Sequence, residues 1–236
     1  MNPQKTARTI EWTEMIGLLA TTVAILFLWN TWVVYPLKIL VVFFHELSHG
    51  LMAVITGGSI KEIRLVAQQG GLCVTAGGNR FLTVSAGYLG SLVMGGIILV
   101  LAARTRYDRT IATAIGGFLI LISLLFVRPV VSFGMVFGFF SGAAMMAAGR
   151  RLPEGANDFI LKVIGLTSCL YAVFDIKSDI LDRPYLYSDA RMLSEITHLP
   201  TMLWGAIWIF IAIVAAVYFL LLASRGEKRR DTDMHV

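Results

Sequence analysis

The sequence predicts an all-α polytopic membrane protein with six or seven transmembrane helices and a small β-hairpin after the second helix. Of its 236 residues, 57% are hydrophobic and only 15% are charged, whereas a soluble domain is nearer half apolar and a quarter charged. The apolar residues also form long runs that alternate with short charged clusters. This pattern is typical of several membrane spans rather than of one large soluble core.

Seven apolar runs are candidates for these helices, each near the roughly 20 residues needed to cross the hydrocarbon core. They lie at residues 14–34, 36–56, 82–103, 110–127, 130–148, 158–176 and 202–223. The first run is longer than the apolar part of a signal peptide, and no small-residue cleavage site follows it, so we expect it to remain as a helix. Residues 1–13 and 224–236 are then a polar and a charged tail around a membrane-embedded domain, 14–223.

The net charge of +5 comes from basic residues in tails and loops. Such residues contact lipid headgroups and set topology in a bilayer, so we expect no nucleic-acid partner. Cys73 and Cys169 are far apart and outside any Cys-x-x-Cys pair, so the sequence implies no disulfide framework and no thiolate zinc site. The sequence thus predicts a multi-pass protein of the cell membrane, and it specifies no oligomeric state.

Residues 57–81 differ from the spans around them. Three Gly-Gly pairs bracket two short runs that contain β-branched residues, Ile60–Ala67 and Leu72–Ala76. Glycine pairs at such spacing indicate turns, so we expect a β-hairpin at about 57–81. Non-helical backbone at membrane depth is tolerated only against protein or a wet cavity, which predicts a cavity near this hairpin.

The segment before the hairpin carries the motif His45-Glu46-Leu47-Ser48-His49. Pro36 suits the start of its helix and Gly57 the end. Residues four apart share a helix face, so the imidazoles of His45 and His49 can bind one ion, and imidazole is a preferred zinc ligand. Glu46 is turned about 100° from His45 and flanks that ion, as a general base must. The pattern is the helical metalloprotease arrangement.

The position of the motif within its span strengthens this interpretation. At 1.5 Å per residue, His45 lies about 13 Å from the helix start, near the middle of a core about 30 Å thick. Ionisable groups at that depth are costly and usually mark function. We therefore predict one bound Zn²⁺ per chain.

Catalytic zinc usually takes three protein ligands, so one more is needed. Asp175 directly follows an apolar run and is our predicted third ligand. Asp179 lies one turn further on the same face, where it could orient a ligand or face the membrane surface. In the rival interpretation, Asp175 caps a helix end instead. His198, in a polar linker beside Pro200, is a further candidate.

The chain resembles the site-2 protease family of intramembrane zinc metalloproteases, and in particular its M50B-like branch. The resemblance covers roughly residues 36–210 and is carried by four segments: His45 to Gly50, the glycine-rich hairpin, Ala86-Gly87-Tyr88-Leu89-Gly90, and Phe174-Asp175 to Ser188-Asp189-Ala190. Other members take the third ligand from a Leu-Asp-Gly segment preceded by Asn and Pro, whereas Phe174-Asp175-Ile176 lacks the glycine. In this family an edge strand near the site is thought to hold the substrate in extended form.

These features predict a zinc-dependent endopeptidase that hydrolyses membrane-anchored protein substrates, with zinc on His45, His49 and Asp175 and with Glu46 as general base. The alternative is a non-catalytic membrane scaffold, or a metal transporter that uses the same ligands. Transporters tend to contain internal repeats, and the two halves of this sequence contain no convincing one.

Overall fold

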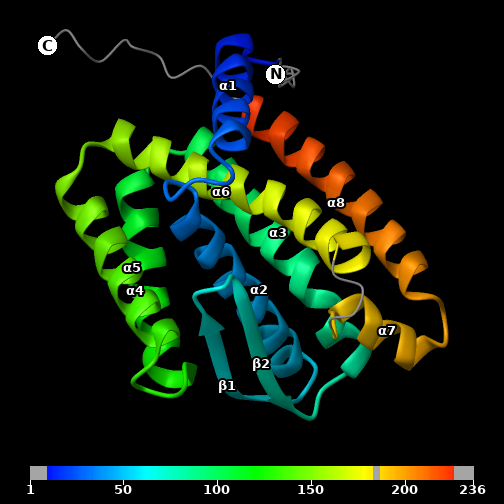
Figure 1. Ribbon diagram of the computed structural model, residues 1–236. Coiled ribbons are helices and arrows are strands. Elements are labelled where there is room, and N and C mark those ends of the chain that lie inside the picture. Colours follow the sequence, from blue (N-terminus) through cyan, green and yellow to red (C-terminus); the bar gives the residue numbers. More distant parts are fainter. Residues whose placement is uncertain (1–9, 183–186, 226–236) are drawn as a thin grey trace, which may run out of the picture.

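The computed structural model describes residues 10–182 and 187–225, so most of both predicted tails lies outside the described residues. Within the described part, eight α-helices form a bundle, and a two-stranded antiparallel sheet lies on one side of it, against α2 (Figure 1). The elements are α1 (Trp12–Phe27), α2 (Tyr35–Ile55), β1 (Ser59–Val66), β2 (Gly70–Ala76), α3 (Arg80–Arg104), α4 (Asp108–Phe126), α5 (Phe133–Arg151), α6 (Glu154–Lys177), α7 (Asp189–Thr197) and α8 (Thr201–Ser224). The predicted fold class, a helical membrane protein with a hairpin after the motif helix, is confirmed.

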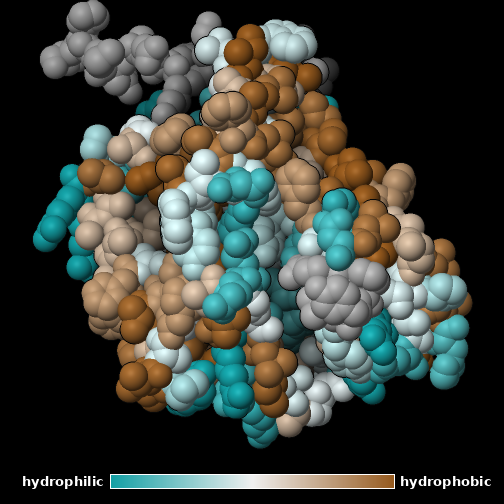
Figure 2. Space-filling model, viewed as in Figure 1, coloured by the Kyte–Doolittle hydropathy of each residue, from teal (hydrophilic) through white to brown (hydrophobic). Residues whose placement is uncertain are grey.

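Five of the helices are long and apolar enough to cross a membrane: α2, α3, α4, α6 and α8. The other two predicted spans form α1, which has 16 residues, and α5, which has 19. Neither is among the five, so the structure supports five of the six or seven predicted spans. Figure 2 shows hydrophobic side chains over α1 and α8, as expected for surfaces that contact lipid.

Helix α2 is the most buried of these spans, because the other elements pack around it. In its most apolar 18-residue window 72% of the residues are buried, against 28% in α4 and 17% in α8. In Figure 1, α4 and α5 pair on one side of α2 and α8 lies on the other, while α6 crosses from the first side to the second. Pro36 stands in the first turn of α2, and Gly57 follows its end with a φ of +90°. The motif helix is thus the core of the molecule.

The hairpin packs against α2 and has one covered edge. The backbone N–H of Arg128, just after α4, donates to the carbonyl of Ile63 in β1 at 2.9 Å. At the turn, Tyr35 donates its hydroxyl to the carbonyl of Ala67 at 2.6 Å. Among the described residues β2 pairs with β1 alone, so its other edge stays available for a further strand. Figure 2 shows hydrophilic side chains along much of the exposed face of the hairpin.

Two short elements follow α6, and the sequence analysis did not predict either. A π-helical turn, Ser178–Asp182, extends α6 by five residues. The nine-residue helix α7 then starts at Asp189, and the Ser188 hydroxyl caps it by accepting from the N–H of Arg191 at 3.4 Å. Helix α7 contacts α3 and α8. Because of this packing, the first residue of α7 lies near the N-terminal end of α3 and close to α2.

Helices α3 and α6 approach closely at facing glycines, as small residues allow in membranes. A Cβ added to Gly165 would lie 2.7 Å from the carbonyl oxygen of Gly95 and 2.9 Å from the amide nitrogen of Leu99. We therefore expect Gly165→Ala to push the helices apart and to destabilise the fold by about 1–3 kcal/mol. The measurement is the thermal unfolding midpoint of the purified protein in detergent.

The matched control is Gly155→Ala, in the same helix. A Cβ there has no heavy atom within 4 Å, and alanine favours helix over glycine. This variant should therefore unfold at or above the wild-type midpoint. Equal losses in the two variants would contradict the proposed close packing.

Candidate metal centre

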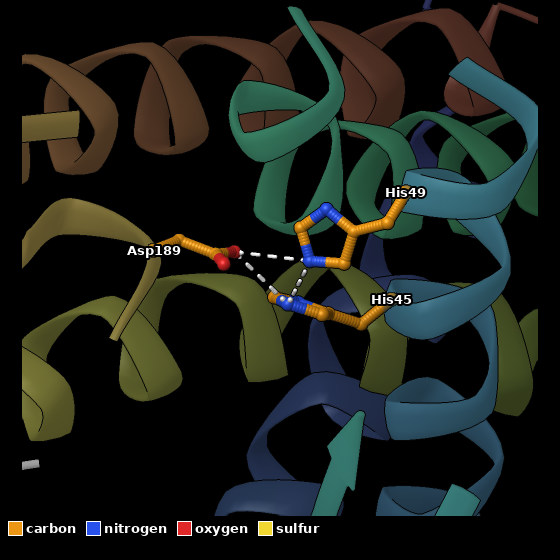
Figure 3. A group of neighbouring side chains, drawn as sticks. All are labelled: His45, His49 and Asp189. Atoms are coloured by element: carbon orange, nitrogen blue, oxygen red, sulfur yellow. Dashed lines mark hydrogen bonds and ion pairs between the residues drawn. The ribbon is translucent and has the colours of Figure 1, made fainter. Parts of the chain in front are cut away.

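Helix α2 presents the two motif histidines on one face, as the spacing predicts. Their Nε2 atoms are 3.1 Å apart, and the ring planes are nearly perpendicular, at 78° (Figure 3). His49 is 8% exposed, and the side chain of His45 is 14% exposed. Two imidazole nitrogens in such close contact share one small, largely buried space.

The third member of the cluster is Asp189, the first residue of α7. Figure 3 shows its carboxylate reaching toward both imidazoles from the side opposite α2. Oδ2 of Asp189 lies 3.1 Å from Nε2 of His45 and 3.3 Å from Nε2 of His49. These three residues form the group of possible metal ligands found among the described residues. A zinc ion with tetrahedral ligands at about 2.0–2.2 Å would space them about 3.3 Å apart, so the three atoms fit such an ion.

The hydrogen bonding of the cluster is also compatible with a bound cation. Nδ1 of His49 lies 2.7 Å from the carbonyl oxygen of Thr83. A carbonyl only accepts, so Nδ1 carries the proton and Nε2 presents a lone pair to the cluster. Oδ2 of Asp189 is buried and, within the described part of the chain, accepts no hydrogen bond. A buried acceptor without a donor is costly, and a metal ion would satisfy it.

Gly87 lets α3 pack directly on the two imidazoles. A Cβ added to this glycine would lie 2.5 Å from Nε2 of His45, and 2.5 Å from both Nε2 and Cε1 of His49. Any side chain there would collide with the two rings. Since α3 closes the cluster on this side, access must come from another direction.

Glu46 and the cluster open into one cavity of about 650 Å³. It is lined by residues of α2, β2, α3, the end of α6 and the start of α7, among them His45, Glu46, His49, Gly71, Cys73, Thr83, Tyr88, Asp175, Asp179 and Asp189. Glu46 is 6% exposed, and it stands beside the imidazoles as the helix geometry predicts. The cavity predicted near the hairpin is therefore present, and the hairpin forms one of its walls.

Asp189 and Cys73, which come from outside α2, differ in their ionisation. Burial alone would raise the pKa of Asp189, but His49 and His45 beside it hold that pKa well below the usual range of a carboxyl. Asp189 is therefore ionised at neutral pH, as a ligand must be. Burial, with the Glu46 carboxylate nearby, raises the pKa of Cys73 to about 12. Its thiol therefore stays protonated at neutral pH.

Asp175, the residue predicted as third ligand, lines the cavity but lies outside the ligand cluster. The reason is that α7 folds back over α3 and carries Asp189 to the imidazoles, while Asp175 stays in the last turn of α6. Asp179, in the π-helical turn, accepts a hydrogen bond from Tyr88, whose ring packs edge-on against His45. His198 ends α7 with a φ of +60°, at the opposite end from Asp189.

Asp189 was not among the predicted ligands, although it lies in a segment that carried the family resemblance. The predicted acidic ligand stands at the end of an apolar span, whereas Asp189 lies in a polar segment between two spans. One local signal was available, because Ser188-Asp189 is a helix N-cap followed by an acid in the first turn. That signal predicts a helix start but not its contact with α2.

The fold and the cluster together define a class of multi-pass membrane proteins that carry a metal-ligand motif inside their helical bundle. A family model described as Peptidase M50B-like matches residues 18–219, so the chain belongs to the M50B-like peptidase family. The resemblance seen in the sequence is thereby confirmed. Membership implies a metalloprotease with protein substrates, and M50 peptidases are typically zinc-dependent. No curated protein and no solved structure matched the chain.

A pair of isosteric variants tests the acidic ligand. We expect Asp189→Asn to lose zinc, because an amide oxygen supplies no charge to the two imidazoles and the ion. The loss in affinity should exceed the roughly 10–100-fold typical of residues that only orient a ligand. Asp175→Asn should keep about one zinc per chain, since catalytic sites hold a single ion with three ligands.

Metal content by mass spectrometry and competition with a chelator measure both effects. Asp175→Asn shares the cavity and the change of charge, and so controls for a general electrostatic effect. The opposite pattern, with zinc lost from Asp175→Asn and kept in Asp189→Asn, would restore Asp175 as the ligand.

Proposed function

We propose that this protein is a zinc-dependent intramembrane endopeptidase that hydrolyses peptide bonds of membrane-anchored protein substrates, with the metal on His45, His49 and Asp189. The observation that carries the proposal is the convergence of three ligand atoms within 3.3 Å of one another. Glu46 opens into the same cavity. A bare metal-storage or scaffold role would not require an acid beside the ligands, whereas hydrolysis does.

The residues divide the chemistry between them. Zinc bound there would polarise the scissile carbonyl and lower the pKa of a water molecule. Glu46 would take a proton from the attacking water and would deliver it to the amine nitrogen that leaves. Thr83 holds the ring of His49 through Nδ1, and Tyr88 packs against the ring of His45. Such outer contacts fix ligand orientation and are as much part of a metal site as the ligands.

The hairpin supports a substrate in extended form. A spanning helix hides its peptide carbonyls in its own hydrogen bonds, so it must unwind before hydrolysis. Strand β2 has a free edge among the described residues and lines the cavity. Pairing the unwound segment to that edge would replace the lost backbone bonds, as in other cases of strand addition. The cell membrane as the location stays a prediction from the sequence.

Glu46→Gln separates the role of the base from metal binding. The amide keeps the shape of the side chain but cannot take a proton, so cleavage should fall by about 10²–10⁴-fold. Zinc content should stay at the wild-type level, because Glu46 is not in the ligand cluster. The assay is cleavage of tagged single-span membrane proteins, co-reconstituted with the purified enzyme in lipid vesicles.

Glu11→Gln is the control, because Glu11 precedes α1, and its side chain makes no capping hydrogen bond. It should cleave at the wild-type rate. Cleavage by Glu46→Gln at that rate would remove Glu46 as the base. Zinc uptake into vesicles without any cleavage by the wild-type protein would favour a transporter instead.

A further inference from the structure

We propose that strand β2 positions the catalytic base: Gly71 and Cys73 hold the carboxylate of Glu46 against the metal centre. This inference rests on the proposed function and extends it. It assigns the hairpin a part in the chemistry itself, in addition to any contact with a substrate. Gly71 and Cys73 are then positioning residues, because they act through Glu46 rather than on the peptide bond.

The first observation is the contact between Gly71 and Glu46. A Cβ added to Gly71 would lie 2.3 Å from Oε1 of Glu46, 2.5 Å from its Cγ and 2.7 Å from its Cδ. Three successive groups of the Glu46 side chain therefore lie against the bare Cα of this glycine. The neighbouring Gly70 differs, since a Cβ there would meet only Val66 of the same hairpin, at 3.2 Å. The close approach is specific to position 71.

The second observation is that Cys73, two residues along the strand, lines the same cavity as Glu46. The Glu46 carboxylate contributes to raising the pKa of the Cys73 thiol, so the two side chains lie close to each other. Gly71 and Cys73 thus approach the same carboxylate from one strand.

The third observation is that β2 itself is docked firmly on α2. A Cβ on Gly50, one turn after Glu46, would lie 3.4 Å from Sγ of Cys73 and 2.6 Å from Cδ1 of Ile60. A Cβ on Gly78 would lie 2.8 Å from the carbonyl oxygen of Ala53. The strand therefore follows α2 over successive turns. A base held by such a strand has a defined position relative to both histidines.

Glu46 needs this support because of its length. A glutamate side chain has several rotatable bonds, and ordering it costs more entropy than ordering most side chains. A helix fixes only the start of the side chain. General-base catalysis depends on the position of the carboxylate, and a displacement of about 1 Å can cost about 100-fold in rate.

The test is a set of double variants read by thermal unfolding in detergent, which needs no substrate. Gly71→Ala should lower the midpoint by roughly 3–10 °C in the wild-type background, because its methyl group overlaps Glu46. The same loss should occur with Glu46→Gln, which keeps the shape. It should largely vanish with Glu46→Ala, which removes the overlapping atoms. Gly70→Ala should shift the midpoint equally in all three backgrounds.

Activity provides the second arm. Gly71→Ala should keep its zinc and its KM, while kcat falls about 100-fold or more, as expected when a base is misplaced. A purely structural role would instead lower zinc content, the amount of folded protein and kcat together. Zinc content is measured on the same samples.

Each outcome has a distinct meaning. An equal midpoint loss from Gly71→Ala in all backgrounds would show that β2 does not hold Glu46, and would overturn the proposal. Normal kcat in a Gly71→Ala enzyme would overturn it as well. If the wild-type protein cleaves nothing, the proposed function fails, and the positioning of Glu46 is still judged by the midpoints.

Discussion

A cluster of three possible ligand atoms, brought together inside an apolar bundle, is the constraint around which this molecule is built. Two imidazole nitrogens and one carboxylate oxygen lie within 3.3 Å of one another. His49 and Asp189 are more than nine-tenths buried. Burial weakens the screening of such a cluster by water, and a cation between the three atoms would stabilise it. Metal binding and folding would then be linked, because an ion on Asp189 would help to hold α7 against α2.

Much of the surrounding structure makes room for this cluster. Gly87 lets α3 pack on the two imidazoles, Gly71 lets β2 approach Glu46, and Gly50 lets the hairpin pack on α2. In soluble proteins such glycines weaken helices and strands. In a membrane bundle they allow backbones to approach closely, and packing then offsets the loss. The same residue type therefore builds both the bundle and the site.

The sequence predicted what depends on neighbours along the chain. The apolar runs predicted the helices, the glycine pairs predicted the hairpin, and the spacing of His45 and His49 predicted their shared face. Each is a local property with a fixed period or turn chemistry. The third acid was missed because Asp189 reaches α2 through the packing of α7 on α3, which is a tertiary contact. Asp175 and Asp189 are equivalent as chemistry, and only the fold distinguishes them. The contact of Gly71 with Glu46 was equally hidden from sequence patterns.

The position of the hairpin allows the motif helix to be buried while its motif stays accessible to water and substrate. The motif helix must be buried to keep its ligands in place, and α2 is the most buried of the five candidate spans. Hydrolysis nevertheless needs water and a substrate with extended backbone. The hydrocarbon core contains no water and does not tolerate extended backbone with unpaired polar groups. A hairpin with hydrophilic side chains along much of its exposed face (Figure 2), packed directly on α2, lines a cavity at the motif without exposing the rest of the helix. If the same strand orients Glu46 and receives the substrate, a bound peptide bond and the base share one rigid support. Their relative position then depends on a single packed contact, β2 on α2, rather than on the mobile bilayer around them.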